Sequence, residues 1–303
     1  MEGIGIIGLG KIGKIIAKRL CKAGINVAGY DIAPDKEELE KIEGLQLNSS
    51  INDLVDSLTP QRIIWIMVPA GEEVDKIIDE ILQADLTAGD IIIDGGNSDF
   101  RDSIRRAKYL KDKNIFFLDV GTSGGVKAEE NGFCLMIGGE KDAFNETTSI
   151  MEALACKDGY LYTGKSGSGH FVKMVHNAIE YGMMEAIGEG FELLHNGPYK
   201  GMLDLEKIAH LWSNGSIIRS FLIELTAQAL SDYPELINIE DYVEDSGEAR
   251  WALREAIDYN IPFDSISHSL FKRIASRQDE SFALKMISAL RKKFGGHKIK
   301  EKE

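Results

Sequence analysis

The sequence is poor in cysteine, and it lacks a long apolar run and an excess of basic residues. Its three cysteines, Cys21, Cys134 and Cys156, are far apart and fit no disulfide or zinc spacing, so we expect a reducing, cytoplasmic setting. No apolar run approaches the roughly 20 residues of a membrane span, so we expect no membrane partner. The chain enters an apolar segment almost at once and shows no basic leader, which predicts no signal peptide.

The charge balance is acidic, with 35 Lys and Arg against 49 Asp and Glu, a net charge of −14. A nucleic-acid-binding protein needs a basic face, so we expect no nucleic-acid partner. An anionic substrate is still compatible with this balance, because a few Arg and Lys side chains can be focused in a cleft. We expect no metal cofactor, because no group of His, Asp and Glu has convincing metal-ligand spacing.

The first half of the chain alternates short apolar runs with helical patterns, and the second half is helical throughout. The alternation predicts an α/β, Rossmann-type N-terminal domain with a mostly parallel, doubly wound sheet over residues 1–163. An all-α C-terminal domain is expected over residues 164–303, after a Gly- and Ser-rich lead. The expected strands are Ile4–Ile7, Val27–Tyr30, Ile63–Val68, Ile91–Asp94, Ile115–Val120, Phe133–Ile137 and Tyr160–Thr163.

The first expected strand runs into a glycine fingerprint, Gly8-x-Gly10-x-x-Gly13, which is followed by a helix. In this context Gly8 permits a tight turn, Gly10 lets the backbone approach a pyrophosphate, and Gly13 lets the helix pack closely. Asp31, at the end of the second strand, can accept hydrogen bonds from an adenosine ribose and would repel a 2′-phosphate. The pattern therefore predicts NAD as the cofactor, with NADP less favoured; the alternative is a glycine-rich turn in another α/β protein.

Three further strand ends are rich in small residues. They are the segments 68–71 (Val-Pro-Ala-Gly), 94–98 (Asp-Gly-Gly-Asn-Ser) and 121–125 (Gly-Thr-Ser-Gly-Gly). Ligands of such sheets bind beyond the carboxyl ends of the strands. Any one segment suits a plain turn, but three of them at one edge favour close backbone approach to a ligand.

One helical segment carries an unusual polar stripe. Lys173, His176, Asn177, Glu180 and Tyr181 share one face at helical spacing, and the other positions are largely apolar. We expect this helix to be buried nearly all round, with the stripe lining a cleft. The alternative is a buried Lys–Glu pair that only holds helices together.

These features together resemble the 6-phosphogluconate dehydrogenases, a branch of the β-hydroxyacid dehydrogenases. The wider family's marks are the glycine fingerprint, the Ser-Gly-Gly loop at 123–125, and Gly169-x-x-x-Lys173-x-x-x-Asn177. The branch is marked by the 94–98 loop, by the 173–181 stripe, and by Arg-Lys-Lys-Phe-Gly-Gly-His at 291–297. The length resembles the family's short form, which commonly uses NAD.

The resemblance implies oxidation of 6-phospho-D-gluconate at C3, followed by loss of C1 as CO2, to give ribulose 5-phosphate. Lys173 is then the general base at the C3 hydroxyl, and Glu180 is the acid that protonates C2. Glu180 lies about 10 Å along the same helix face, so both groups can reach one six-carbon chain. The rival interpretations are a β-hydroxyacid dehydrogenase that does not decarboxylate, and a non-catalytic nucleotide sensor on the same fold.

The resemblance also implies the binding residues. Those for the cofactor are Gly8, Leu9, Gly10, Lys11, Ile12, Gly13, Asp31, Val68, Pro69, Ala70 and Asn97. Those for the carboxylate and inner hydroxyls of the substrate are Asn97, Ser123, Gly124, Gly125, His176 and Asn177. Tyr181, Arg273 and Arg291 are expected to hold the phosphate, and His297 to approach the sugar, although Arg273 could be an ordinary helix-surface charge.

In the family the tail reaches the neighbouring subunit's site, so a homodimer or tetramer is implied. The chain departs from the family pattern in three places. Thr122 replaces a hydrophobic residue, and Lys127 and Ala128 follow the Ser-Gly-Gly loop where related short enzymes tend to have an aromatic residue and glycine. The segment 246–251 resembles only loosely the one that supplies a phosphate-binding lysine.

Overall fold

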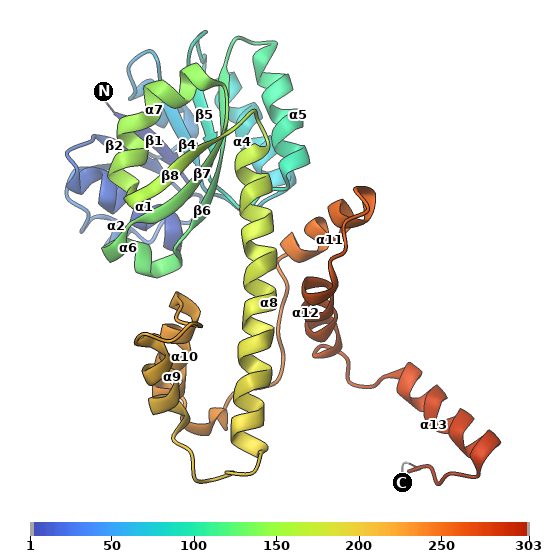
Figure 1. The fold of residues 1–303 in the computed structure, drawn as a ribbon. Helices are drawn as coiled ribbons and strands as arrows, with labels where there is room; N and C mark the ends of the chain where they lie inside the picture. Colours follow the sequence, from blue (N-terminus) through green and yellow to red (C-terminus); the bar gives the residue numbers. More distant parts are fainter. Residues whose placement is uncertain (1–2, 302–303) are drawn as a thin grey trace. The chain divides into compact units, whose positions relative to one another are not determined.

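A computed structural model of the chain describes residues 3–301 (Figure 1). The chain divides into two compact units, Met1–Asn177 and Ala178–Glu303, which we call the sheet unit and the helical unit. The division falls inside helix α8 (Ser168–Asn196), whereas the last strand of the sheet ends at Gly164. The expected domain boundary after residue 163 stays a prediction.

The sheet unit is built around one eight-stranded sheet in the order β3-β2-β1-β4-β5-β6-β7-β8. All neighbouring strands are parallel except β6 and β7, which confirms the predicted mostly parallel sheet. The order of the first six strands is that of the dinucleotide-binding fold. The strands are β1 (Ile4–Ile7), β2 (Val27–Tyr30), β3 (Leu45–Leu47), β4 (Ile63–Ile66), β5 (Ile91–Asp94), β6 (Phe116–Ser123), β7 (Phe133–Gly139) and β8 (Ala155–Gly164).

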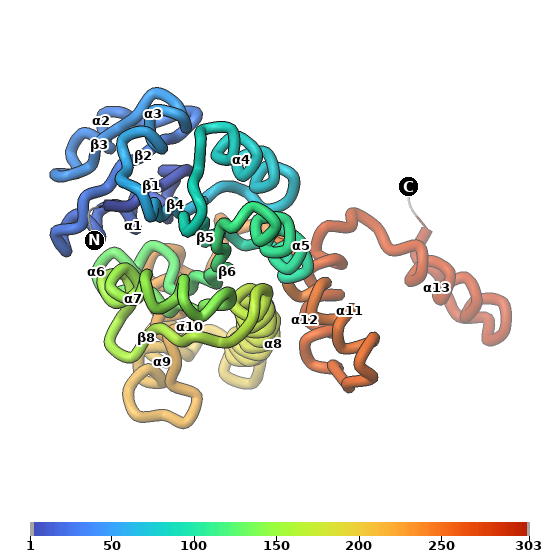
Figure 2. Tube along the Cα trace, turned by 90° about the horizontal axis from the view of Figure 1, so that it is seen from above, coloured from blue at the N-terminus to red at the C-terminus, as the bar shows by residue number. Residues whose placement is uncertain are grey.

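Helices cover both faces of this sheet, as Figure 2 shows for α3 and α4 on one side and for α6 and α7 on the other. Successive strand residues alternate between two apolar cores: Ile63 and Trp65 belong to one, and Ile64 and Ile66 to the other. This follows from the period of two along a strand. The helices of the unit are α1 (Lys11–Lys22), α2 (Lys36–Leu39), α3 (Ile51–Asp56), α4 (Glu72–Gln83), α5 (Phe100–Lys111), α6 (Ala128–Asn131) and α7 (Lys141–Leu154).

Five strands differ from the sequence-based expectation: β4 ends two residues earlier and β7 two residues later than expected, and β3, β6 and β8 differ more. β3 was not expected, because it has three residues, none of them buried, and so carries no apolar signal. β6 continues to Ser123 instead of ending at Val120, because its antiparallel pairing with β7 extends to Ser123 and Cys134. β8 begins at Ala155, five residues earlier than expected, within a polar stretch that periodicity does not mark as a strand.

The helical unit contains the rest of α8 and five further α-helices, and no strand lies in its described part, 178–301, which confirms the all-α expectation. The helices are α9 (Leu205–Ser213), α10 (Phe221–Asp232), α11 (Glu248–Asp258), α12 (Asp264–Ala275) and α13 (Phe282–Gly295). Among the described residues, no helix is long and apolar enough to cross a membrane.

The expectation that the polar-striped helix is buried nearly all round is wrong for the single chain. On α8 the apolar side chains of Phe171, Val172, Ile179 and Met183 are 38–50% exposed. Met174, Ala178 and Tyr181 are buried. The apolar body of the helix was read correctly from the sequence, but one chain does not supply enough packing partners to cover it.

A buried arginine joins two helices of the sheet unit to the loop after β5. The Arg106 side chain is 1% exposed; Nη1 donates to Asp94 Oδ2 (3.1 Å) and Nε donates to Asp75 Oδ1 (2.8 Å). Nη2 donates to the carbonyl oxygen of Gly71 (2.8 Å). Asp94 is itself fully buried, so it depends on Arg106 for its counter-charge.

We expect Arg106→Leu to lower the free energy of unfolding by about 3–5 kcal/mol, because it leaves a buried carboxylate without its counter-charge. Arg105→Leu is the matched control: Arg105 also pairs with Asp75, but its side chain is 55% exposed. It should change stability by about 1 kcal/mol or less. Urea titrations of the three proteins measure both effects, and equal losses in the two variants would contradict a special role for Arg106.

Candidate active site

The glycine fingerprint forms a tight turn between β1 and α1. Gly8 has a φ of +95°, and a Cβ on it would lie 2.3 Å from the carbonyl oxygen of Met67. A Cβ on Gly13 would lie 1.9 Å from the Gly8 carbonyl oxygen, so only glycine lets α1 start this close to the strand. A Cβ on Gly10 would meet nothing within 4 Å, and α1 has no side-chain N-cap. The turn thus offers open backbone N–H groups at a helix N-terminus, as a pyrophosphate requires.

Asp31 is tied to the same turn. Its Oδ2 accepts a hydrogen bond from the Leu9 N–H (2.6 Å), and its Oδ1 accepts one from the Ala33 N–H (2.8 Å). The carboxylate therefore stands at the carboxyl end of β2, beside the fingerprint. Lys11 is exposed on the first turn of α1, and Ile12 is half-buried there.

The loop after β5 is shaped by a carboxylate. Asp94 accepts hydrogen bonds from the Gly96 N–H (3.1 Å) and from the Ser98 hydroxyl (2.7 Å), which bends the loop around Asn97. Of the segment after β4, Val68 is half-buried, and Pro69 and Ala70 are exposed. The structure thus places Asn97 and residues 68–70 beyond the carboxyl ends of β5 and β4, the edge at which such sheets bind ligands.

A chain of hydrogen bonds connects four of the expected site residues at the end of β6 and on α8. Lys173 Nζ donates to Asn177 Oδ1, which also lies 2.9 Å from His176 Nδ1. The amide oxygen can only accept, so His176 carries its proton on Nδ1. His176 Nε2 lies within hydrogen-bond distance of the Ser123 hydroxyl, at 3.3 Å. Gly124 and Gly125 follow Ser123, both with positive φ, and begin the turn into a short 3-10 helix.

Lys173 is pressed against β6. A Cβ on Gly121 would lie 2.4 Å from the Lys173 Cβ. Gly121, which precedes the Ser-Gly-Gly loop, therefore allows α8 to approach β6 closely. The Thr122 hydroxyl reaches the carbonyl oxygen of Gly95 (3.4 Å), so the residue that departs from the family pattern bridges two of the predicted ligand loops.

In the helical unit, Tyr181 and Arg273 come together. The Tyr181 side chain is 4% exposed, and its hydroxyl oxygen accepts a hydrogen bond from the Ser246 N–H (3.1 Å). The Arg273 guanidinium lies 3.5 Å from the centroid of the Tyr181 ring, and its Nη1 donates to the carbonyl oxygen of Glu244 (3.1 Å). Arg273 is therefore packed on an aromatic face and is not an isolated surface charge.

Two more arginines, which sequence reasoning missed, converge on Asp245 beside this pair. Arg250 makes a two-pronged contact with Asp245 (2.8 and 2.9 Å), and Arg277 donates to the same carboxylate (2.8 Å). The signal for Arg250 was present, because it lies in the segment 246–251 that only loosely matches the family. Nothing in the sequence marked Asp245 or Arg277, because their meeting depends on how α11 and α12 pack.

Arg291 and His297 are exposed and are not joined to this group. Helix α13 buries none of its residues, and within 3–301 no hydrogen bond or ion pair links Arg291 or His297 to Tyr181 or Arg273. The ring of His297 packs edge-on to Phe294, with centroids 6.3 Å apart. Glu180, seven residues after Lys173 on the same helix, is half-buried.

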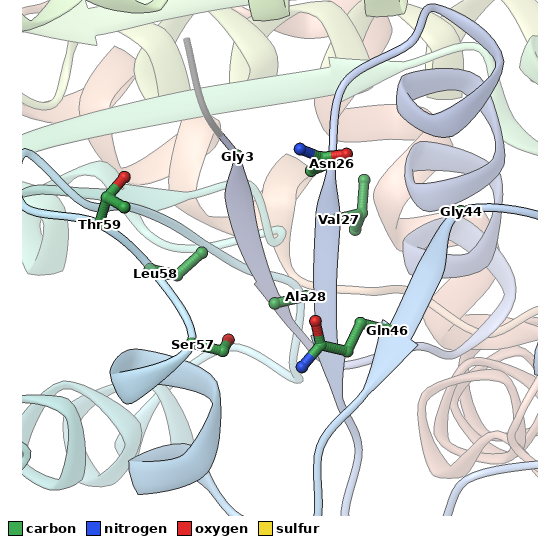
Figure 3. Close-up of a pocket in the computed structure, with 9 residues that line it drawn as sticks. All are labelled: Gly3, Asn26, Val27, Ala28, Gly44, Gln46, Ser57, Leu58 and Thr59. Carbon is green, nitrogen blue, oxygen red and sulfur yellow. The ribbon is translucent and has the colours of Figure 1, made fainter.

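Two other features lie outside the expected site. Within 3–301 one group of side chains has metal-ligand spacing, Glu185 and Glu189 on α8 with His268 on α12, all half-buried or exposed. The sequence did not suggest it, because His268 is far along the chain. A polar cavity of about 220 Å³ lies at the amino ends of β1, β2 and β3, where Asn26 and Gln46 line it (Figure 3). This is the sheet edge opposite the glycine fingerprint, so the cavity is not part of the dinucleotide site.

The dinucleotide-binding fold and its glycine turn, followed by a helical second domain, define the class of protein: an NAD-binding oxidoreductase. Residues 3–164 match the sequence model of the NAD binding domain of 6-phosphogluconate dehydrogenase, and residues 169–303 match that of its C-terminal domain. These matches cover nearly the whole chain. The chain belongs to the 6-phosphogluconate dehydrogenase family.

Individual relatives agree with this placement. The chain is 41% identical to the NAD(+)-dependent, decarboxylating 6-phosphogluconate dehydrogenase of Haloferax volcanii, over 99% of both chains. It is 36% identical to the enzyme of the same description from Bacillus subtilis, where the match covers 95% of this chain and 64% of that one. The short form is therefore shared with the first relative and not with the second.

Solved structures give the same result. The 6-phosphogluconate dehydrogenase of Plasmodium falciparum superposes with a TM-score of 0.82 at 29% identity, over 99% of this chain and 67% of that one. The 3-hydroxyisobutyrate dehydrogenase of Mycobacterium tuberculosis gives a TM-score of 0.71 at 21% identity, over 96% and 99% of the two chains. The second likeness shows only that the fold is shared.

The ion pairs of Asp245 make a prediction about acid stability. Hydrogen bonds from Arg250 and then Arg277 lower the pKa of Asp245 from 3.8 to about 2, against the opposing effect of burial. A carboxyl group whose pKa is lower in the folded state stabilises the fold above its unfolded pKa, and this contribution is lost as the pH falls toward the folded pKa. We expect Asp245→Asn to cost about 2 kcal/mol at neutral pH, with the deficit shrinking as the pH falls from 5 toward 3.

Thermal unfolding from pH 7 to pH 3 measures this effect. Asp241→Asn is the matched control, because Asp241 is exposed four residues earlier in the same segment. A deficit in Asp245→Asn that stays constant over this pH range would show that the ion pairs do not cause it.

Proposed function

We propose that this protein oxidises 6-phospho-D-gluconate with NAD and decarboxylates the product to ribulose 5-phosphate. The observation that carries the proposal is the hydrogen-bonded chain from Lys173 through Asn177 and His176 to Ser123, at the carboxyl end of β6. It places a lysine among groups that can bind hydroxyls and a carboxylate. The same helix carries an acid, Glu180, two turns further on.

Lys173 removes the proton of the C3 hydroxyl. Loss of a hydride from C3 leaves a ketone only if that proton also departs, so a base must lie within hydrogen-bond reach of the oxygen. Lys173 must be neutral to act, and the positive charge of a bound nicotinamide would favour that form. A nicotinamide cofactor held at the turn from Gly8 to Gly13 would supply the hydride acceptor. Asn177 Oδ1 holds Nζ in place, and Ser123 and His176 bind the inner oxygens of the substrate.

Decarboxylation and the final protonation follow from the ketone. The 3-keto acid loses C1 as CO2, because the ketone accepts the electron pair, and the protonated Lys173 stabilises the developing enolate. Glu180 then donates a proton to C2 of the enediol. A helix rise of 1.5 Å per residue separates the two groups by about 10 Å along the helix axis, a span that one six-carbon substrate can bridge.

Tyr181 and Arg273 bind the substrate phosphate, and we add Arg250 to this group. A phosphate dianion favours planar guanidinium donors. Arg273 stacks on the Tyr181 ring, and Arg250 lies four residues after Ser246, whose N–H donates to the Tyr181 hydroxyl. The family's phosphate-binding lysine comes from the segment that corresponds to residues 246–251. In this chain Arg250 lies in that segment and would take the place of the lysine.

The cofactor is NAD, held at the turn from Gly8 to Gly13 with Asp31 beside it. The backbone around Gly10 is open, and the N-terminus of α1 has N–H groups free for a pyrophosphate. The carboxylate of Asp31 suits a ribose hydroxyl and repels a 2′-phosphate. Val68, Pro69, Ala70 and Asn97 complete the site at the neighbouring strand ends.

The working enzyme is a homo-oligomer, a dimer or a tetramer, in the cytoplasm. Helix α13 buries no residue, and its large apolar side chains Phe282, Leu284 and Phe294 are 67–78% exposed. A largely apolar cavity of about 430 Å³ also lies among Met183, Phe191, Trp212 and Ile223 of the helical unit. Apolar surface of this extent is typical of a protein-protein interface. The tail with Arg291 and His297 completes the site of a neighbouring subunit.

The function is tested with 6-phosphogluconate and either NAD or NADP, by following NADH or NADPH formation and CO2 release together. We expect one CO2 per NADH and a clear preference for NAD. Lys173→Met should lower kcat by at least about a thousandfold, because it removes the base, and should leave NAD binding intact. NADH formation without CO2 would favour the non-decarboxylating alternative, and no turnover by the wild-type protein would contradict the proposal.

The shared site is tested by mixing subunits. We expect Arg291→Ala to raise the KM for 6-phosphogluconate, because it removes a phosphate partner, while Lys285→Ala on the same helix should not. Co-assembled Lys173→Met and Arg291→Ala chains should regain activity, because one of their two sites then has both groups intact. Mixed oligomers that stay inactive, or an Arg291→Ala homo-oligomer with an unchanged KM, would contradict a tail shared between subunits.

A further inference from the structure

Asp119 on β6 is a buried carboxylate that the proposed mechanism does not use. Its side chain is 0% exposed, and both of its oxygens point at the start of α8. Oδ1 accepts a hydrogen bond from the Gly167 N–H (2.6 Å), and Oδ2 accepts one from the His170 N–H (2.9 Å). N–H groups at a helix start have no partner within the helix, and a carboxylate there also meets the positive end of the helix dipole.

This contact fixes α8 to the sheet at a point where the packing leaves no free space. A Cβ on Gly169 would lie 2.2 Å from the Asp119 carbonyl oxygen and 2.5 Å from that of Met136. The backbone of the first turn therefore rests directly on β6 and β7. The two hydrogen bonds of Asp119 hold N–H groups three residues apart. They therefore fix both the distance of this turn from the sheet and its rotation about the helix axis.

A buried carboxylate at position 119 lowers the stability of the fold, so stability alone does not explain it. Burial raises the pKa of its carboxyl group, which means that the charged form is disfavoured there, while the nearby His170 lowers the pKa. A buried charge costs stability unless it is well paired. An apolar residue would fill a position between sheet and helix at lower cost, but it could not bind two N–H groups in a fixed direction.

Lys173 lies three residues, just under one turn, after His170 on the same helix. The position of its side chain therefore follows the position of the first turn. We infer that Asp119 is a positioning residue for Lys173: it holds the first turn of α8 so that Nζ meets the C3 hydroxyl of the substrate. This inference rests on the proposed function.

The experiment compares Asp119→Asn with Asp90→Asn. Asp90 is the matched control, because it is also buried in the sheet unit but binds the N–H groups of Arg62 and Thr87 instead of α8. The measurements are kcat and KM for 6-phosphogluconate, the NAD dissociation constant, the melting temperature, and the isotope effect on kcat with substrate deuterated at C3.

We expect Asp119→Asn to lower kcat by about 10- to 100-fold, the scale of loss when a catalytic group is displaced by about 1 Å. The deuterium isotope effect should rise, because hydride transfer becomes slower relative to the other steps, and NAD affinity should not change. Asp90→Asn should lower the melting temperature and leave both kcat and the isotope effect as in the wild type. A merely structural role for Asp119 would give the pattern of Asp90.

An unchanged kcat in folded Asp119→Asn would overturn the inference, and so would a loss of NAD affinity in step with kcat. If Asp119→Asn does not fold, Asp119→Glu decides, because it keeps the charge and moves it by one methylene. In that variant a lower kcat with a raised isotope effect supports the inference, whereas normal kinetics or failure to fold overturns it. An inactive wild-type protein would contradict the proposed function itself. An active wild type with fully active Asp119 variants would contradict only the inference about Asp119.

Discussion

The direct contact between the first turn of helix α8 and strands β6 and β7 is the constraint on which the site in the sheet unit depends. Glycines at 121 and 169 remove the side chains that would keep the backbones apart. Asp119 satisfies the N–H groups that the helix start leaves open. Because the helix is held at both its backbone and its amino end, Lys173, His176 and Asn177 project from a rigid base, and a catalytic group has to be positioned to within a fraction of an ångström.

Arginine contacts, from the buried Arg106 to the exposed Arg250, connect other parts of the structure. Arg106 connects α4, α5 and the loop after β5, and through Asp94 it shapes the segment that carries Asn97. In the helical unit Arg250 and Arg277 share Asp245, while Arg273 stacks on Tyr181. The protein has a net charge of −14, yet its arginines gather at a few defined points. This is how an acidic chain can still offer a local cationic site to an anionic ligand.

The fold class, and the candidate site residues that the structure joins on α8, could be predicted because the evidence is local in sequence. The strands β1, β2 and β5 were delimited by their apolar runs, and the Gly8–Gly13 turn by its glycine spacing between an apolar strand and a helix. The polar stripe of α8 identified Lys173, His176 and Asn177, which the structure joins by hydrogen bonds. Local patterns failed where pairing or burial depends on a distant segment. β3 is too short to show a period, and the early start of β8 is set by its pairing with β7.

By itself the sequence determined the two-part architecture, the glycine turn and the polar face of α8, because each is encoded in residues about two helical turns apart or less. Only the tertiary structure decided which buried charges meet. The partners of Asp119 lie 48 and 51 residues away, and Arg277 lies 32 residues from Asp245. It also decided that much of the apolar body of α8 stays uncovered in one chain. Periodicity tells which face of a helix is apolar, but whether anything packs against that face depends on elements far along the chain or on another molecule.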